Sequence, residues 1–186
     1  SLHDALPISL SFVGQGASSS GITSTALQNT AARSNSTLEF RDITVARASN
    51  GAWSPAKNNA SPTNFTFRLS GAVLQNVSEL TVAAPYATVD FLNGSSATFS
   101  SKFSIGGTNT VLTIDDSSIT TGNVFTPADA DGPGMKVRLR GTAPLLRKTS
   151  GFFTVWKQSH EVVYEFQVPA GGYAAAPVQD AGTSYR

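Results

Sequence analysis

The feature that most constrains this chain is a short apolar–polar–apolar triplet that recurs along most of its length. Successive triplets begin 22 to 29 residues apart. Most are followed within a few residues by Gly, Ser, Asn or Asp, and then by another short apolar stretch. One supersecondary unit therefore repeats with loops of variable length. The triplets are Leu38-Glu39-Phe40, Phe67-Arg68-Leu69, Val89-Asp90-Phe91, Leu112-Thr113-Ile114, Val137-Arg138-Leu139 and Tyr164-Glu165-Phe166.

Apolar residues at every second position, in short pieces bounded by turn formers, predict short β-strands. The repeat is too short for a strand–helix–strand unit, and the chain lacks the asparagine-anchored leucine ladder of a leucine-rich repeat. An antiparallel sandwich has strands at a similar density and remains an alternative. Because triplet and turn recur together at coil length, we predict an all-β fold. It is a right-handed, single-stranded parallel β-helix (β-solenoid) of about six coils, with the outer two residues of each triplet in its core.

Stacking the triplets in register brings residues of opposite charge together on the outside of the solenoid. Neighbouring coils lie about 4.8 Å apart, so side chains at equivalent positions become neighbours. The apolar residues alone fix this register, so the agreement of the charges supports it independently. Exposed pairs contribute only about 0–1 kcal/mol each. The expected pairs are Glu39 with Arg68, Arg68 with Asp90, Arg138 with Glu165 and, two positions along the strand, Asp115 with Arg140.

Composition fits this architecture and argues against some classes of partner. Hydrophobic residues make up 40% of the 186 residues, enough for a core, whereas charged residues make up only 13%. The net charge of +1 provides no electrostatic footprint for nucleic acid or an anionic membrane. The chain has no cysteine, which excludes disulfides, thiolate metal sites and cysteine nucleophiles. It also lacks a run of about 18 apolar residues, so we expect no membrane-spanning helix.

The pattern divides the chain into one repeat domain with short flanking segments. Residues 9–34 carry weak apolar signals and are expected to form a first coil or a linker. Residues 35–178 are expected to form the parallel β-helix, and 179–186 a truncated tail. A solenoid needs caps on its open edges, and the turn-rich C-terminal stretch offers none, so we expect an incomplete fragment. Variable inserts between coils are expected at 46–64, 126–134 and 147–159.

The opening residues SLHDALPI differ from the Ser- and Gly-rich repeat that follows. Written as the codons TCC CTA CAC GAC GCT CTT CCG ATC, they resemble a common short-read sequencing adapter translated in one frame. The resemblance implies that Ser1–Ile8, with one of the two histidines (His3), is an artefact to be left out of fold reasoning. A genuine N-terminal strand is the alternative.

Three runs, GGTNTVLTIDDSSITTGN, RGTAPLL and YEFQVPAGGYAAAPVQ, resemble the passenger repeats of bacterial autotransporter-like surface proteins. The resemblance covers about residues 64–178. It implies a right-handed parallel β-helix that is secreted or carried on a bacterial cell surface. That family offers no fixed catalytic motif, so the resemblance implies no active-site residue, cofactor or metal.

Aspartates on neighbouring coils raise the alternative of a carbohydrate-active β-helix enzyme. Such enzymes cluster carboxylates on adjacent coils with Arg, Lys or bound Ca²⁺. We expect Asp90, Asp115 and Asp116 on adjoining coils, near Arg138 and Arg140. Catalysis by paired carboxylates needs one member with a shifted pKa, through burial or a close like charge. Aspartates beside arginines in an exposed ladder stay ionised instead, so we predict a solvated charge ladder and no catalytic residue.

The other candidate catalytic, metal-binding or sugar-binding residues are isolated from one another in the sequence. Asp129 and Asp131 precede a glycine, like the opening of a calcium loop, but the remaining ligands of an EF-hand are missing, and we interpret the segment as a polar turn. His160 has no second histidine near it and is interpreted as a loop-edge residue. Trp53 and Trp156 lie in inserts, where a tryptophan stacks on a sugar or, more often, anchors its own loop.

Five N-x-Ser/Thr sequons are present in a chain rich in Asn, Ser and Thr, and we interpret them as chance matches. They begin at Asn35, Asn59, Asn64, Asn76 and Asn93.

We therefore expect a structural or adhesive function, as a stalk or display segment of a secreted or surface-anchored bacterial protein. No catalysis, cofactor or metal is expected, and any glycan or protein partner would bind through the inserts. The segment is expected to be monomeric within a longer chain. The alternative, a polysaccharide lyase or hydrolase, predicts that Asp90, Asp115 and Arg138 converge in a groove.

Overall fold

The described part of the chain contains only β-strands and turns. Its residues include no helix that is long and apolar enough to cross a membrane. The computed structural model describes residues 9–24, 34–56, 62–122, 124–127, 134–150, 156–157 and 160–180.

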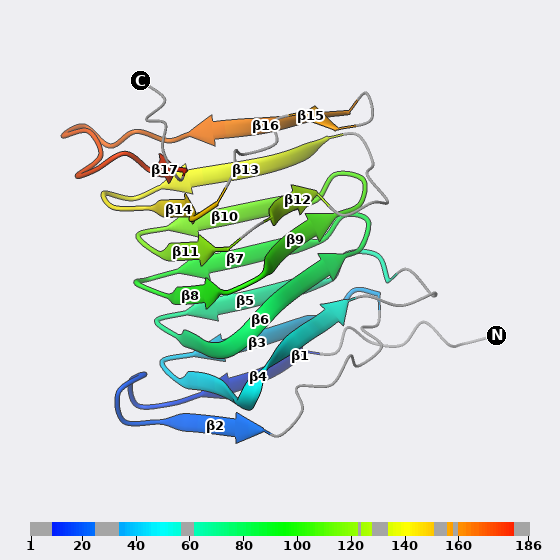
Figure 1. Cartoon of the computed structure of the whole chain (residues 1–186), viewed down its shortest axis with the longest axis vertical. Coiled ribbons are helices and arrows are strands. Elements are labelled where there is room, and N and C mark those ends of the chain that lie inside the picture. The colour runs from blue at the N-terminus through cyan, green and yellow to red at the C-terminus, as the bar shows by residue number, and fades with distance from the viewer. Residues whose placement is uncertain are drawn as a thin grey trace.

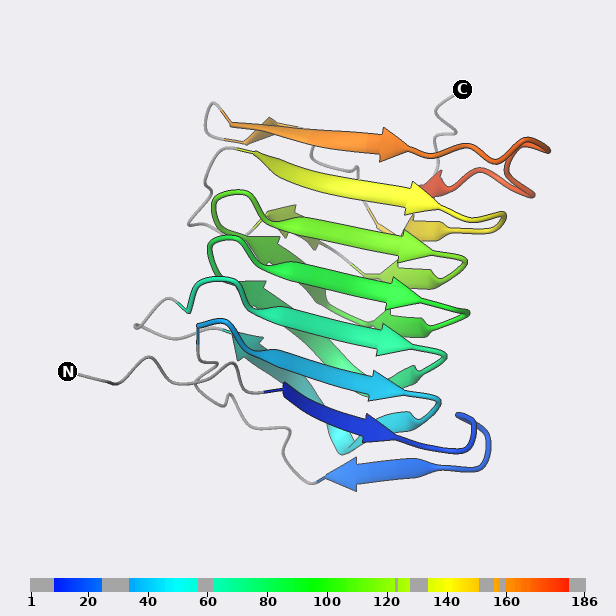
Figure 2. The same cartoon turned by 180° about the vertical axis from the view of Figure 1, so that it is seen from behind.

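The strands stack into a parallel β-solenoid of about five turns (Figure 1). The strands nearer the viewer run to the right as the chain climbs, both in Figure 1 and from behind in Figure 2, so the solenoid is right-handed. The predicted fold class is confirmed. The antiparallel sandwich is wrong, because every described strand pair except the short β15–β16 pair is parallel. The solenoid has about five turns, where the sequence predicts about six coils.

One side of the solenoid, called sheet A here, contains all six predicted triplets, each in its own strand. Their first members stack in one column in the predicted register, because residues of one parity along each strand face the core. In spatial order its strands are β1 (Ser9–Val13), β3 (Thr37–Arg41), β5 (Thr66–Ser70), β7 (Thr88–Leu92), β10 (Val111–Asp115), β13 (Met135–Arg140), β16 (His160–Phe166) and β15 (Trp156–Lys157).

The remaining strands form sheet B, which bends around the rest of each coil. Its long N-terminal strands divide in later coils: β6 pairs with β8 through Val73 and Leu74, and with β9 through its C-terminal half. The strands are β2 (Gly21–Ser24), β4 (Thr44–Ala56), β6 (Val73–Ala83), β8 (Ser96–Phe99), β9 (Lys102–Gly106), β11 (Ser118–Thr121), β12 (Val124–Pro127), β14 (Leu145–Lys148) and β17 (Val178–Gln179).

The prediction of a loop insert at 46–64 is wrong over its first half, because β4 continues to Ala56. The pairing of β4 with β6 contains register shifts between Ala46 and Gly51 and again around Trp53. Bulges of this kind take up extra residues and bend a strand without ending its pairing. Residues 57–61, together with 128–133 and 151–155 of the other two inserts, lie outside the described residues.

The core is a continuous apolar column between the two sheets, as predicted. Phe67, Phe91, Phe99 and Phe103 have almost no exposed surface. Phe103 joins the two sides: its ring stacks on Phe99 at 5.2 Å and meets the edge of Phe91 at 6.0 Å. Burial of such rings is the main favourable term that holds neighbouring coils together.

Two turns repeat along the solenoid, and each places at least one residue in the left-handed region of φ. Gly, Asn and Asp adopt this conformation at the lowest cost, which explains why they occupy every one of these turn positions except that of Tyr86. The turn after the sheet A strand places Asp42, Gly71, Asn93, Asp116 and Gly141 there, with φ between 45° and 84°. The turn before it places Asn35, Asn64, Tyr86, Asn109 and Gly134 there, with φ between 54° and 83°.

Candidate functional site

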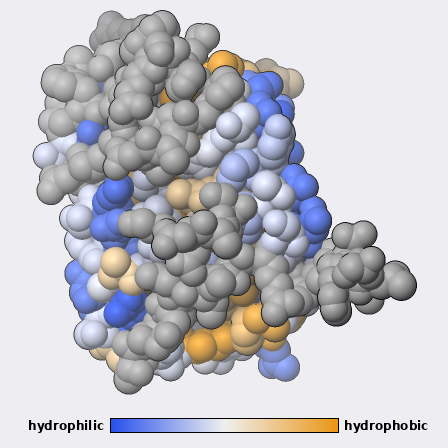
Figure 3. All heavy atoms as spheres, turned by 90° about the vertical axis from the view of Figure 1, so that its right-hand side faces the viewer, coloured by the Kyte–Doolittle hydropathy of each residue, from blue (hydrophilic) through white to orange (hydrophobic). Residues whose placement is uncertain are grey.

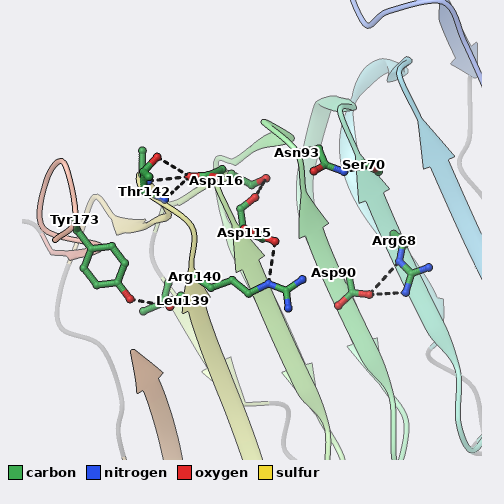
Figure 4. A network of polar contacts seen from close by, with 12 residues as sticks. Arg68, Ser70, Asp90, Asn93, Asp115, Asp116, Leu139, Arg140, Thr142 and Tyr173 are labelled. Atoms are coloured by element: carbon green, nitrogen blue, oxygen red, sulfur yellow. Dashed lines mark hydrogen bonds and ion pairs between the residues drawn. The ribbon is translucent and has the colours of Figure 1, made fainter. Parts of the chain in front are cut away.

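The outer face of sheet A carries the predicted charge ladder, with three of the four expected pairs formed (Figure 4 shows two of them). Both Nε and Nη2 of Arg68 donate to one carboxylate oxygen of Asp90, at 3.0 and 2.8 Å. The other pairs are Arg140 Nε to Asp115 Oδ2 at 2.8 Å and Arg138 Nε to Glu165 Oε2 at 2.6 Å, with Lys136 Nζ on the second oxygen of Glu165 at 2.8 Å.

The predicted pair between Glu39 and Arg68 is replaced. Glu39 accepts hydrogen bonds from Arg41 Nη2 at 2.9 Å and from Ser11 Oγ at 3.1 Å. Arg68 is adjacent to Glu39 in register but turns its guanidinium to Asp90, one coil further on. Arg41 lies two positions along the same strand and reaches the same side, so it takes the place left by Arg68.

The ladder is also less solvated than predicted. Glu39 and Asp90 are only 9% and 6% exposed, although both project outward. Arginine side chains from neighbouring positions cover them, and each arginine keeps its own outer part in water. The charges of these carboxylates are therefore stabilised by the arginine side chains that lie over them, and not by water.

Every described carboxyl with a resolved pKa shift is moved downward. Arg41 lowers the pKa of Glu39 against the opposing effect of burial, and Lys136 followed by Arg138 lowers that of Glu165. A general acid at neutral pH needs a raised pKa, so these groups are suited to remain charged.

Asp90, Asp115 and Arg138 do not converge, because each has its own partner on a different coil. The groove beside the ladder, of about 420 Å³, is lined by Glu39, Arg41, Asp42, Arg68, Ser70, Leu92 and Asn93, and so by none of those three residues.

Asp116, another catalytic candidate, closes a turn. Its Oδ1 accepts the backbone N–H groups of Thr142 and Ala143 at 2.5 and 2.9 Å, and the Thr142 hydroxyl at 3.0 Å (Figure 4). These bonds, led by that of Ala143, lower the pKa of Asp116. The carboxylate thus ties its own coil to the next one.

The remaining candidates are placed as follows. Trp53 is 3% exposed and meets the rings of Phe67 and Phe40 edge-on at 5.3 and 6.0 Å, so it is an anchor and not a sugar platform. His160 is the first residue of β16, where it pairs with Lys157 of β15. Trp156 pairs with Glu161, and the side chains of His160 and Trp156 are outside the description.

Asp129 and Asp131 lie outside the described residues, as does the whole of Ser1–Ile8. Within the described part, no three His, Asp or Glu side chains come together where they could hold a metal ion.

The sequons gain a structural explanation. Asn35, Asn64, Asn76 and Asn93 all have φ of 56° or 57°, and Asn59 lies outside the described residues. Asn64 Nδ2 also donates to Asn35 Oδ1 at 2.9 Å, which links two coils through one turn column. Asparagine is one of the few residues that tolerate this conformation, so the backbone favours it at these positions. The regular spacing of Asn and Gly around the triplets indicates such turns in the sequence.

A second groove, of about 500 Å³, lies on the outside of sheet B beside the bulged strand β4. We call it the amide groove. Asn50, in the bulge, donates from Nδ2 to Ser100 Oγ at 3.1 Å, and Asn76 Nδ2 donates to the carbonyl of Arg47 at 3.0 Å. Arg47 also donates to the carbonyl of Ala52, so the bulge is held by its own polar contacts. The lining residues are Asn50, Val73, Leu74, Gln75, Asn76, Ser96, Ala97, Thr98 and Ser100.

The chemistry of the amide groove is neutral. Amides and hydroxyls donate and accept hydrogen bonds, and the partly exposed Val73 adds apolar surface. Gln75 and Thr98 are exposed and lie on the neighbouring strands β6 and β8, each directly after the paired residues Leu74 and Ala97. No side chain of the lining titrates, so the groove is suited to bind neutral polar groups and not to exchange protons with them. The sequence did not reveal it, because residues 46–64 were interpreted as a loop.

A scan against models of protein families and searches of curated proteins and of solved structures found no match.

Proposed function

We propose that this chain is a structural and adhesive segment of a secreted or surface-anchored bacterial protein, and that it binds neutral glycans through the amide groove. The proposal agrees with the resemblance of its repeats to autotransporter-like passengers. The solenoid provides a stiff rod, and the groove provides a site on the side of that rod. Such a segment displays a binding surface without performing a reaction.

The observation that carries this proposal is the composition of the groove. Its lining combines three amide side chains, those of Asn50, Gln75 and Asn76, with hydroxyls of Ser and Thr. Sugar hydroxyls both donate and accept hydrogen bonds, which matches amide and hydroxyl partners. Val73, which is partly exposed, offers apolar contact for the C–H face of a sugar ring. A charged ligand would find no countercharge in this lining.

The direct test is a screen of neutral and anionic oligosaccharides against the chain, followed by titration calorimetry on those that bind. The variant Gln75→Ala/Thr98→Val removes two exposed polar groups from the groove. We expect it to weaken binding at least tenfold while leaving thermal unfolding unchanged. Thr120→Val is the matched control, because Thr120 stacks on Thr98 one coil further on and is not part of the lining.

Two results would overturn the proposal. One is absence of binding to every neutral glycan tested. The other is binding that Gln75→Ala/Thr98→Val leaves intact. Cleavage of a bound polysaccharide that Asp90→Asn or Asp115→Asn abolishes would support the enzyme alternative instead.

We further propose that Ser1–Ile8 is translated adapter sequence. The support is the match of all eight residues to the adapter in a single reading frame. Sequencing through the locus with long reads tests this, and a genomic SLHDALPI upstream of Ser9 would overturn it.

A further inference from the structure

One residue in the turn before sheet A departs from the pattern of its neighbours. The turns of successive coils stack on one another, and the Tyr86 N–H, for example, donates to the carbonyl of Thr108 in the next coil at 2.7 Å. Tyrosine therefore stands in a column that otherwise consists of asparagine and glycine. At the equivalent position of successive coils the chain has Asn35, Asn64, Tyr86, Asn109 and Gly134, all with positive φ.

The backbone at Tyr86 forms a tight turn that is unfavourable for a bulky residue. The Ala87 N–H donates to the carbonyl of Ala84 at 3.3 Å, with Pro85 second and Tyr86 third in the turn. Tyr86 has a φ of 57°. A positive φ at the third position, after proline, is typical of type II turns, which prefer Gly or Asn there. Tyrosine thus has a conformational cost at this position that asparagine avoids in the neighbouring coils.

The packing of Tyr86 does not offset that cost. Tyr86 is 52% exposed, and it is the one exposed large apolar residue in the described coils from β3 to β14. Among the described residues its hydroxyl has no hydrogen-bond partner and its ring stacks on no other ring. A single exposed aromatic residue indicates nothing by itself. One that is held in a strained turn without packing indicates a function.

The surroundings of Tyr86 are polar and neutral. The three adjacent turns, 62–66, 84–88 and 106–110, contain no charged residue. Asn64 donates from Nδ2 to Asn35, and Oδ1 of Asn109 lies where a Cβ on Gly134 would be, so both flanking amides are directed away from the ring. Figure 3 looks onto this side of the rod, where the described atoms between its two ends are mostly white to blue.

We propose that Tyr86 is the stacking platform of a second glycan-binding site, which takes one neutral sugar ring. The face of an aromatic ring is electronegative, and the C–H groups of a sugar ring pack against it. Asn64 and Asn109 are exposed and lie one coil to either side, at the strand spacing of about 4.8 Å. Their amides are placed to exchange hydrogen bonds with the hydroxyls of the sugar. An anionic sugar would find no countercharge in these turns.

This site is separate from the amide groove. The groove is lined by the first four residues of β6, Val73–Asn76, whereas Tyr86 follows the end of that strand. The two sites share a class of ligand with the proposed function, but neither site requires the other. The inference and the proposed function can therefore fail separately.

Nitration of tyrosine by tetranitromethane, followed by peptide mass spectrometry, reports on Tyr86 directly. The probes are cellotetraose, xylotetraose, mannotetraose and maltotetraose, with tetragalacturonic acid as the anionic comparison. We expect at least one neutral probe to slow nitration of Tyr86 by about fivefold or more. Tyr173, whose hydroxyl donates to the carbonyl of Leu139, should keep its rate. The same protection should persist in Gln75→Ala/Thr98→Val, which alters the groove alone.

Tyr86→Asn gives this turn the residue that its neighbours have, so the variant should fold at least as well as the unaltered chain. We expect it to unfold at the same or a higher temperature and to bind the protecting sugar about tenfold more weakly. Calorimetry in the Gln75→Ala/Thr98→Val background measures this without the groove. Tyr86→Phe keeps the ring, and as the matched control it should bind within about twofold of the unaltered chain.

The proposal is overturned if no neutral probe slows nitration of Tyr86, or if Tyr86→Asn binds as tightly as the unaltered chain. It is equally overturned if Tyr86→Asn unfolds at a lower temperature, because the tyrosine would then stabilise the turn. Binding that the groove variant weakens and Tyr86→Asn does not would leave the proposed function standing and remove this inference. Protection of Tyr86 that the groove variant leaves intact, with no binding at the groove, would do the reverse.

Discussion

The two outer faces of this solenoid are built on opposite principles. Sheet A consists mostly of short strands in unbroken register, and its outward charges are matched to one another across coils. The N-terminal part of sheet B has a 13-residue and an 11-residue strand with shifts of register, and its groove is lined by neutral groups. A face that repeats satisfies its own polar groups and leaves little for a ligand. A binding surface arises where the repeat is broken.

The largest effect should come from removing the anchor of the irregular face. Trp53 is buried against Phe40 and Phe67, and it holds the C-terminal half of β4 on the core. Trp53→Ala should lower the free energy of unfolding by about 3–5 kcal/mol, through lost burial and a cavity. Urea denaturation measures this. Val168→Ala, at a side chain that is 60% exposed, is the control and should change it by less than about 0.5 kcal/mol. Equal effects of the two would mean that β4 does not depend on its tryptophan.

The next largest effect should come from the covered part of the charge ladder. Arg68 donates two hydrogen bonds to Asp90, which is 6% exposed. Arg68→Ala should cost about 1–3 kcal/mol, because it leaves a buried carboxylate without its partner. Adding Asp90→Ala should restore part of the loss, and a double-mutant cycle measures the coupling. Strictly additive losses would contradict this account of the pair.

The contrast between the faces also explains why the sequence predicts the side-chain pairs of sheet A but not the groove of sheet B. Along sheet A the side-chain period of two fixes which residues face the core, so six triplets were enough to predict the stacking partners of Asp90, Arg138 and Asp115. In β4 the shift of register after Ala46 changes that parity. No simple alternation therefore predicts that Trp53 is buried while Asn50 lines a groove.

The sequence could not predict the partner of Glu39 either, but the reason is not a shift of register. Arg41 and Arg68 both lie within reach of it, one along the strand and one across it. The sequence gives their positions, but the outcome depends on Arg68 being occupied by Asp90, which is a property of the folded face.

A smaller effect is expected where the same ladder is open to water. In the Arg140–Asp115 pair the two side chains are 44% and 27% exposed. Arg140→Ala should cost only about 0–1 kcal/mol, and less still at high salt, because water screens the pair and solvates the carboxylate left behind. Thermal unfolding at low and high salt, beside Arg68→Ala, measures the difference. A loss equal to that of Arg68→Ala would show that burial does not set the value of these pairs.

The smallest expected effect is on the pH dependence of stability. It should distinguish the two faces, because carboxylates line sheet A and the amide groove of sheet B is neutral. The pKa of Glu39 is lowered below its ordinary 4.5, chiefly by the hydrogen bond from Arg41, and that of Glu165 is lowered by Lys136 and Arg138. A carboxyl with a depressed folded pKa stabilises the fold fully above its unfolded pKa. That contribution is lost as pH falls through the folded value. Glu39→Gln/Glu165→Gln should therefore flatten the loss of stability below about pH 4.5, measured by thermal unfolding from pH 6 downward. Gln75→Ala in the amide groove should leave that slope unchanged, because the groove lining contributes no titrating group. An unchanged slope in the glutamine variant would mean that acid acts on the solenoid elsewhere than through these two ladder carboxylates.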